Sequence, residues 1–258
     1  MVKSYTITLQ GGRPYQEDNY TNIELDSKNY FCGVFDGHGG DAMSIMCKDL
    51  FPVVLNQGIS ASPHDICQSI KSSFYVVDEF ARNMNNPGVG STVVFTLITK
   101  ETIWFANAGD SIAIVGYNDN TCEVMSQEHK VENEKERITH TGGTITYFDG
   151  IARVNGNLNV SRSIGDHYLK KWVICEPYVR SVSLRRRDVR YIFLASDGIS
   201  DVISAKSIND IINSNIDFDV FGNKEEKIKE VISAITKLAQ NLGSTDNITA
   251  TYVVVDTV

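Results

Sequence analysis

Runs of apolar, β-branched and aromatic residues recur along the chain and predict strands. They lie at residues 4–9, 30–35, 92–99, 103–106, 111–115, 191–195 and 248–255. Residues of these types favour extended backbone. Several runs are short and closely spaced, and short connections suit antiparallel strands, because parallel strands need long crossovers. The pattern therefore predicts antiparallel sheets.

Amphipathic stretches predict three helices. The first covers residues 41–55, and we expect Pro52 to stop or kink it. The second follows Ser62-Pro63, interpreted as a helix cap with proline at the first helical position. Its apolar residues recur at spacings of three and four, at Ile66, Ile70, Phe74, Val77 and Phe80. Helices with one apolar stripe cover sheet faces, and the third stretch has such a stripe at Ile228, Val231, Ile232, Ile235, Leu238 and Leu242.

No internal repeat, low-complexity tract or long Pro/Ser-rich linker divides the chain, so we expect one domain over residues 1–258. The first eight residues alternate polar and apolar side chains and do not resemble a signal peptide. No apolar run approaches the roughly 20 residues that a bilayer requires. We therefore expect a cytoplasmic or nuclear protein without a membrane partner, and from the length we expect no added regulatory domain or anchor.

The chain is acidic overall, with 32 Asp and Glu residues against 24 Lys and Arg and a net charge of -8. An acidic surface repels phosphate backbones, so we expect no nucleic-acid partner. A short basic run at residues 185–187, with Arg190 beyond it, is interpreted as a solvated turn. The five cysteines include no C-x-x-C pair, which is typical of a reducing compartment.

Acidic residues gather at five places, residues 13–18, 35–40, 107–111, 195–198 and 244–247. In three of them a predicted strand runs directly into Asp-Gly or Gly-Asp, which places a carboxylate where the backbone turns. One such dipeptide is usually an ordinary turn. Asp36, however, precedes Gly-His-Gly-Gly, and Asp197 precedes another glycine. Carboxylates and glycine carbonyls are ligands that Mg²⁺ and Mn²⁺ prefer, and two such ions can activate water for attack on phosphorus.

Nine short motifs follow one another along nearly the whole chain. They are R-x-x-x-E-D at 13–18, FDGHGG at 35–40, GST at 90–92, NAGDS at 107–111, QEHK at 127–130, GG at 142–143, LNVSRSIGD at 158–166, LASDGISDV at 194–202 and STDNIT at 244–249. In this order they resemble the PPM/PP2C-type metal-dependent serine/threonine protein phosphatases. The resemblance implies an α+β fold, a four-layer α-β-β-α sandwich of two antiparallel sheets flanked by helices, and the predicted strands and helices fit it.

The resemblance also implies a site for two Mn²⁺ or Mg²⁺ ions. Asp36 matches the carboxylate that bridges both ions, and the carbonyl of Gly37 matches a ligand of the second. Asp197 and Asp246 match ligands of the first ion. Glu17 matches a residue that reaches an ion through bound water.

Other matched positions surround these ligands. Asp18 matches a residue that assists Glu17. Arg13 matches the residue that clamps the substrate phosphate, and a guanidinium fork suits that role because it pairs with two oxygens at once. His38 matches the proposed general acid that protonates the leaving serine or threonine oxygen; alternatively, it orients a metal-bound water.

In many members of the family that the sequence resembles, an Asp in a D-H-K motif and a second Asp can hold a weaker third ion. Here Glu128 stands at the first position and Asp201 at the second. Because Glu is longer by one methylene, we expect the third ion to be shifted, weakened or absent. Asp110, in the NAGDS motif, is interpreted as a structural turn residue.

The function implied is hydrolysis of phosphoserine and phosphothreonine in phosphoproteins by direct attack of a metal-bridging hydroxide, in a monomeric enzyme. Two alternatives stay open: a pseudophosphatase that only binds phosphoproteins, and a metal-dependent phosphodiesterase or nuclease. The first would lose a metal carboxylate, and Asp36, Asp197 and Asp246 are all present. The negative net charge disfavours the second. No cysteine is followed six positions later by the arginine that a cysteine-dependent phosphatase needs, and no phosphate-binding P-loop motif occurs.

Overall fold

The computed structural model describes residues 2–84, 86–184, 188–216 and 224–255. The strands of its two five-stranded sheets are β1 (Lys3–Leu9), β2 (Asn19–Glu24), β3 (Tyr30–Phe35), β6 (Val93–Ile98), β7 (Thr102–Ala108), β8 (Ile112–Tyr117), β9 (Cys122–Val124), β13 (Tyr178–Ser183), β14 (Val189–Ala195) and β15 (Ile248–Val254). The helices that cover them are α1 (Ala42–Ala61), α2 (Ile66–Asn83), α4 (Asp197–Ser200), α5 (Ala205–Asn215) and α6 (Lys224–Asn241).

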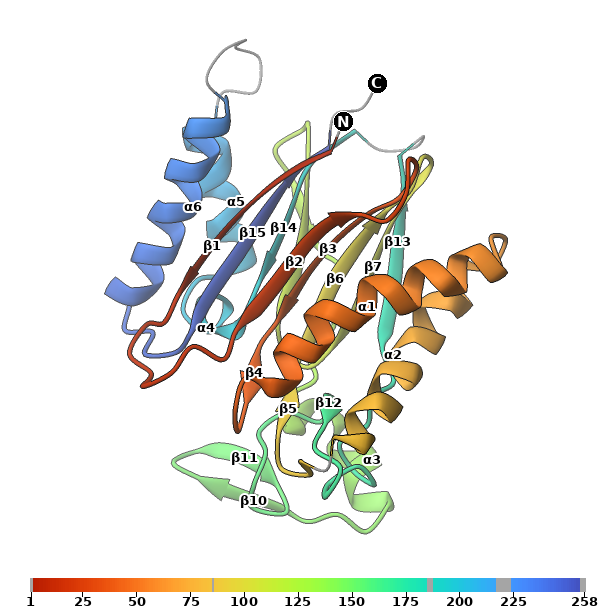
Figure 1. Cartoon of the computed structure of the whole chain (residues 1–258). Coiled ribbons are helices and arrows are strands. Elements are labelled where there is room, and N and C mark those ends of the chain that lie inside the picture. Colours follow the sequence, from red (N-terminus) through yellow and green to blue (C-terminus); the bar gives the residue numbers. More distant parts are fainter. Residues whose placement is uncertain (1, 85, 185–187, 217–223, 256–258) are drawn as a thin grey trace.

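These elements form four layers (Figure 1). One antiparallel sheet has the strand order β1-β15-β14-β8-β9, and the other has the order β13-β7-β6-β3-β2. Helices α5 and α6 pack on the outer face of the first sheet, and α1 and α2 pack on the outer face of the second. The predicted α+β, four-layer α-β-β-α sandwich is confirmed.

The central strands are buried on both faces, which explains their continuous apolar runs. In β3, Phe31 and Phe35 pack with the residues of α1 and α2, whereas Cys32 and Val34 lie in the core between the two sheets. Strand β14 alternates in the same way between the α5–α6 core and the core between the sheets. All seven predicted strand runs correspond to strands of the structure.

Two helix predictions need correction. Helix α1 does not stop near Pro52 but continues to Ala61, because the buried residues Phe51, Leu55 and Ile59 carry its apolar stripe past the proline. Ser62 is the C-terminal cap of α1, and its N–H donates to the Gly58 carbonyl. The N-terminal cap of α2 is Asp65, whose side chain accepts from the Gln68 N–H at 2.9 Å.

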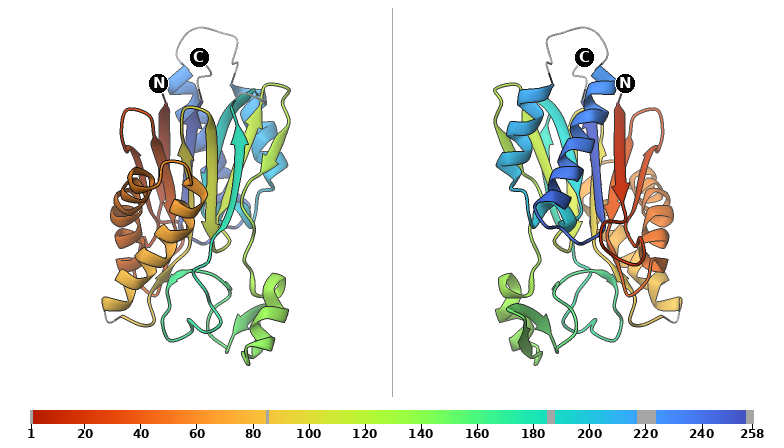
Figure 2. Two further views of the ribbon diagram at one scale, coloured as in Figure 1. Left: turned by 90° about the vertical axis from the view of Figure 1, so that its right-hand side faces the viewer. Right: turned by 90° about the vertical axis from the view of Figure 1, so that its left-hand side faces the viewer.

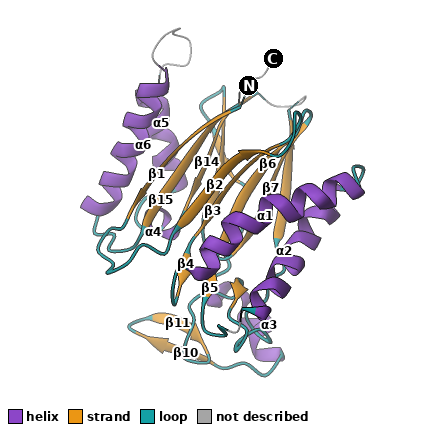
Figure 3. Cartoon of the chain, in the orientation of Figure 1, coloured by secondary structure: helices purple, strands orange, loops and turns teal. Residues whose placement is uncertain are grey.

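A smaller lobe extends beyond one end of the sandwich (Figure 2). This lobe, residues 131–175, contains the 3₁₀ helix η1 (Val131–Glu134), helix α3 (Lys135–His140) and the hairpin of β10 (Ile145–Phe148) and β11 (Ile151–Val154). Its small apolar core includes Val131, Ile138, Val154, Val160 and Leu169. The figure coloured by secondary structure shows how much of the lobe is loop (Figure 3). The expectation of a single domain is not tested by this arrangement and stays a prediction.

Three short strands join the lobe to the sandwich, in the order β12-β5-β4. They are β4 (Gly37–His38), β5 (Gly90–Ser91) and β12 (Ile164–Gly165). The basic run at 185–187 lies outside the described residues. Arg190 lies within β14 and not in a turn, and its guanidinium donates to the side chains of Asn118 and Asn120. Among the described residues, no helix has the length and apolar character needed to cross a membrane.

Candidate active site

The acidic residues singled out in the sequence meet at one end of the strands. Asp36 directly follows β3, and Asp197 begins α4 just after β14. Strand β1 pairs with β15 so that Leu9 lies opposite Ile248, and this register brings the loop after β1 against the loop that holds Asp246. The pocket between these segments has a volume of about 150 Å³. It is lined by Arg13, Glu17, Asp36, Gly37, His38, Gly39, Thr92, Asp110, Asn159, Val160, Asp197 and Asp246.

Close backbone packing explains why glycine follows Asp36. The Gly37 N–H donates to the Glu17 carbonyl at 3.2 Å. A Cβ on Gly37 would lie 2.6 Å from that carbonyl oxygen and 2.8 Å from the Ser44 hydroxyl, so only glycine fits. The carbonyl of Asp36 accepts from the Thr92 N–H at 2.8 Å. These contacts hold the Asp36-Gly37 turn against the loop that carries Glu17.

Burial and mutual repulsion disfavour ionisation of the clustered carboxyl groups. Burial first, and then the charges of Asp197, Asp18 and Asp110, raise the pKa of Asp36 well above its ordinary value. Burial and the charges of Asp197 and Asp246 raise the pKa of Asp18 to about 7. Burial and the charge of Asp246 raise the pKa of Asp197 to about 6. Among the described residues, the nearby positive charge does not offset this burial and repulsion, because all three pKa values stay raised.

Unpartnered oxygens show that the cluster suits a cation. Oδ1 of Asp18, Oδ2 of Asp110 and Oδ1 of Asp197 are buried without a hydrogen-bond partner among the described residues. Such atoms are rare in folded proteins, because an unpaired buried polar atom costs about 1–3 kcal/mol. Hard cations prefer an all-oxygen environment of this kind.

The carboxylates are not arranged as a finished ligand shell. In the part of the chain that the structure describes, no group of three His, Cys, Asp or Glu side chains has the geometry of a metal site. Two contacts account for this: Asp36 and Asp197 share a hydrogen bond, and Arg13 donates to Asp246 at 2.7 Å. Mutually bonded carboxyl groups are what such a cluster forms when only its own side chains can satisfy its oxygens.

Arg13, His38 and Glu17 border the carboxylates. The Arg13 side chain is 53% exposed; burial acts to lower its pKa, but the bond to Asp246 and the nearby carboxylates raise it. Nε2 of His38 lies 2.7 Å from Oδ2 of Asp166. One carboxylate oxygen of Glu17 accepts from the Gly40 N–H at 2.6 Å. The structure therefore brings all three residues to the pocket, as the motifs predicted, without testing their roles.

The two carboxylates expected to hold a third ion, Glu128 and Asp201, are paired with the ammonium group of Lys130. Nζ of Lys130 lies 2.8 Å from Oδ1 of Asp201 and 3.1 Å from Oε1 of Glu128. Burial acts to lower the pKa of Lys130, but these two carboxylates raise it above its ordinary value, so the ammonium stays charged. The Asn133 amide also donates to Glu128, at 3.2 Å. An ion at this position would have to compete with Lys130.

Sequence reasoning underestimated Asp110 and left Asp166 without a role. Asp110 is only 6% exposed and lines the pocket, and burial followed by the charge of Asp197 raises its pKa well above the ordinary value. It therefore belongs to the carboxylate cluster and is not merely a turn residue. The signal available in the sequence was its motif, Gly109-Asp110, which has the same strand-to-turn pattern as the other acidic sites.

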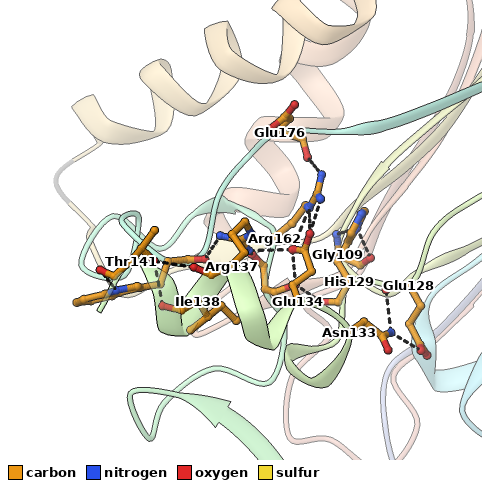
Figure 4. Close-up of polar contacts among 12 residues, drawn as sticks. Gly109, Glu128, His129, Asn133, Glu134, Arg137, Ile138, Thr141, Arg162 and Glu176 are labelled. Carbon is orange, nitrogen blue, oxygen red and sulfur yellow. Dashed lines mark hydrogen bonds and ion pairs between the residues drawn. The ribbon is translucent and has the colours of Figure 1, made fainter. Parts of the chain in front are cut away.

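A second group of charged residues lies within the lobe (Figure 4). The Glu134 side chain accepts from Arg162 and from Arg137, the latter at 2.8 Å, and both guanidinium groups are turned toward it. Burial acts to raise the pKa of Glu134, but the two arginines lower it to about 2. Burial lowers the pKa of the neighbouring His129 to about 4, so this ring is neutral at pH 7.

Comparison with known proteins places this arrangement in a family. The sequence matches the family described as Protein phosphatase 2C over residues 8–248. It is 30% identical to probable protein phosphatase 2C 25 of Arabidopsis thaliana over 93% of this chain and 61% of that protein. It is 30% identical to protein phosphatase 1B of Rattus norvegicus over 95% of this chain and 68% of that protein. The chain thus spans less than two thirds of the length of the Arabidopsis relative.

The fold is similar to a crystal structure of serine-threonine phosphatase 2C from Toxoplasma gondii. The TM-score is 0.83 at 24% sequence identity, and the match covers 98% of this chain and 94% of the other. At this identity the likeness establishes the architecture alone.

Proposed function

Because the chain belongs to the protein phosphatase 2C family, we propose that it is a metal-dependent protein serine/threonine phosphatase that acts as one catalytic domain over residues 1–258. The observation that supports this most is the cluster of buried carboxylates with unpartnered oxygens at the strand ends. Such a cluster needs cations, and the Mg²⁺ or Mn²⁺ dependence general to the family would supply them. Phosphoproteins are then the substrate class.

The residues that would hold two Mg²⁺ or Mn²⁺ ions are Asp36, the carbonyl of Gly37, Asp197 and Asp246, with Glu17 acting through water. All five line the pocket. Two such cations, when bound, neutralise the substrate phosphate and supply a water of lowered pKa as the nucleophile.

Arg13 and His38 would act on the substrate itself. The half-exposed guanidinium of Arg13 already pairs with a carboxylate at the pocket, and the same donors suit two oxygens of a phosphate. His38 lines the pocket with its side chain 26% exposed, where it can give a proton to the departing serine or threonine oxygen. The alternative, in which His38 only orients the attacking water, is separable by experiment.

Metal titration against a phosphothreonine peptide tests the proposal. We expect hydrolysis that EDTA abolishes and that Mn²⁺ or Mg²⁺ restores. Tight peptide binding without turnover would instead establish a pseudophosphatase, and catalytic cleavage of plasmid DNA with Mn²⁺ would establish a nuclease.

The leaving group distinguishes the two roles of His38. The alkoxide of a phosphothreonine peptide needs a proton, whereas nitrophenolate leaves without one. We expect His38→Gln to lower turnover of the peptide about 100-fold and that of p-nitrophenyl phosphate only a few-fold. Equal losses on both substrates would favour the water-orienting role.

A further inference from the structure

The polar contact between His38 and Asp166 is built by the three short strands that join the lobe to the sandwich. Within this small sheet, β5 lies in the middle, and Gly90 is opposite both His38 of β4 and Gly165 of β12. Figure 1 shows the three strands together at the end of the sandwich. Asp166 directly follows Gly165, so the register itself brings its carboxylate beside the histidine ring.

The central position of this sheet must be glycine for the contact to form. A Cβ on Gly90 would overlap both Oδ2 of Asp166 and Nε2 of His38. Because Gly90 has no side chain, the Asp166 carboxylate and the His38 imidazole approach each other in the space that a Cβ would occupy. The glycine of the GST motif thus serves the pair directly.

The backbone at Asp166 is held in an unusual conformation that aims the carboxylate. Gly165 and Asp166 have φ values of 84° and 51°, both in the left-handed region. Three bonds hold this turn: the Gly165 N–H donates to Asp78 at 2.9 Å, the Asp166 N–H donates to the Val89 carbonyl at 3.1 Å, and the Leu169 N–H donates to the Asp166 carbonyl at 2.8 Å. A non-glycine residue in this region costs of order 1 kcal/mol or more, and it persists only where the surroundings enforce it.

The carboxylate of Asp166 is an ionised acceptor. Its side chain is 1% exposed, and Oδ2 also accepts from the Ser163 hydroxyl at 2.6 Å. Burial acts to raise its pKa, but the bonds from His38 and Ser163 and the charge of Lys170 lower it below the ordinary value. A carboxylate without a proton can only accept, so the nitrogen that faces it must carry the hydrogen.

We propose that Asp166 is the positioning residue for His38, holding Nε2–H toward itself and leaving Nδ1 as the nitrogen that serves the pocket. A buried carboxylate that fixes one nitrogen of a histidine sets both the tautomer and the direction of the ring. When His38 carries a proton on both nitrogens, it gives the Nδ1 proton to the departing oxygen and returns to the neutral ring whose remaining proton, on Nε2, is held by Asp166. This inference rests on the proposed phosphatase function, and Asp166 itself touches no substrate.

Asp166→Asn tests the proposal with little change of shape. Asparagine is one of the few residues that tolerate a left-handed backbone, so the turn survives. Its amide offers both a donor and an acceptor to His38, and the tautomer is no longer enforced. We expect turnover of a phosphothreonine peptide to fall about tenfold or more, with KM nearly unchanged, while p-nitrophenyl phosphate loses less than about threefold.

Asp78→Asn is the matched control. Asp78 is also buried, at 5% exposure, and it does not contact His38 in the described structure. In Asp78→Asn the amide oxygen still accepts from the Gly165 N–H, so the turn that aims Asp166 is kept while the charge that faces Lys170 is removed. We expect this variant to lower the unfolding temperature while leaving the ratio of the two turnover rates unchanged. If both variants change the ratio alike, or if Asp166→Asn lowers both rates equally or neither, the positioning role is overturned.

A readout without turnover completes the test. ¹⁵N shifts of the neutral His38 ring in the wild-type protein should show a protonated Nε2 and an unprotonated Nδ1, and Asp166→Asn should change that pattern; the opposite tautomer in the wild type overturns the proposal. A wild-type protein that shows the expected tautomer but no metal-dependent hydrolysis overturns the proposed function, and the positioning role falls with it. Active wild-type protein with the wrong tautomer overturns the positioning role alone.

Discussion

Glu134 in the lobe and the carboxylates at the strand ends are both withdrawn from water, yet they differ in what neutralises them. Glu134 lies between Arg137 and Arg162, and these partners lower its pKa to about 2 although burial opposes them (Figure 4). At the strand ends, burial and neighbouring carboxylates raise the pKa of Asp18 to about 7 and that of Asp197 to about 6.

The difference separates a structural group of charges from a functional one. A buried charge is tolerated when it is paired, and the lobe supplies its own pairing. The strand-end cluster has more negative charge than its arginine and lysine neutralise, and the protein keeps this imbalance in a pocket open to solvent. Strongly perturbed carboxyl groups in a pocket are typical of a site completed by something from solution.

Removing one carboxylate charge from the strand-end cluster should abolish phosphatase activity and reduce the electrostatic repulsion within the cluster. We expect Asp197→Asn to lower metal-dependent phosphatase activity about 1,000-fold, because the several kcal/mol that a metal ion supplies require its ligand. The same change should raise the unfolding temperature of the EDTA-treated protein, since it removes like-charge repulsion. Kinetics on a phosphothreonine peptide and thermal unfolding measure the two effects.

Asp49→Asn is the control for that variant, because Asp49 is exposed on α1 and away from the pocket. It should leave both activity and stability unchanged. Activity in Asp197→Asn within tenfold of the wild type would contradict the functional side of the comparison, and a lower unfolding temperature would contradict the electrostatic side.

The opposite result is expected in the lobe. Glu134→Gln leaves two arginines facing each other at a site where the native side chain is 10% exposed, so we expect a loss of about 3 kcal/mol in the free energy of unfolding. Urea unfolding measures this loss, and Glu132→Gln, at an exposed residue of η1, is the matched control. Ion binding at the strand ends should persist in Glu134→Gln, as calorimetry with Mn²⁺ can check. A variant as stable as the wild type would show that the arginines do not need Glu134.

The sequence allows most of the strands and the main carboxylates of the site to be predicted, but not the full course of α1. Strand runs were predictable because β3 and β14 are buried on both faces and therefore lack polar interruptions. The gathering of Asp36, Asp197 and Asp246 was predictable from their motifs, each next to a strand end or start. The passage of α1 through Pro52 was not, because it depends on packing against α2 and the sheet, which local propensity does not contain.

Contacts between distant segments were also out of reach. The partners of Glu134 are three and 28 residues away, and Asp166 is 128 residues from His38. Only the antiparallel register of β4, β5 and β12 brings the latter pair together. Asp110 was interpreted as a turn residue because its flanking strands were visible, whereas its burial among other carboxylates was not.

Low pH should remove the stabilisation of the folded state that the Glu134 carboxylate provides. A carboxyl group whose pKa is lower in the folded state than in the unfolded state stabilises the protein fully at pH values above its unfolded-state pKa. This contribution is lost as the pH falls through the folded-state pKa. For Glu134 that window runs from the ordinary 4.5 down to about 2. With EDTA present throughout, the stability difference between the wild type and Glu134→Gln should be about 3 kcal/mol at pH 7 and should approach zero near pH 2. A difference that stays constant across this range would show that the loss comes from packing and not from charge.

The smallest effect is expected at Lys130, which pairs with carboxylates that the sequence predicts to be ion ligands. Its ammonium neutralises Glu128 and Asp201 much as the arginines neutralise Glu134, although both carboxylates are about half exposed. In Lys130→Gln this pair loses its internal cation, so we expect a third Mn²⁺ to bind about tenfold more tightly than in the wild type, a modest gain because exposed charges are screened. Calorimetric titration measures it, with Lys135→Gln, at an exposed lysine of α3, as the control. If Lys130→Gln binds no additional ion, Glu128 and Asp201 do not form a cation site even without Lys130. The carboxylates that need a cation from solution are then only those that surround Asp36.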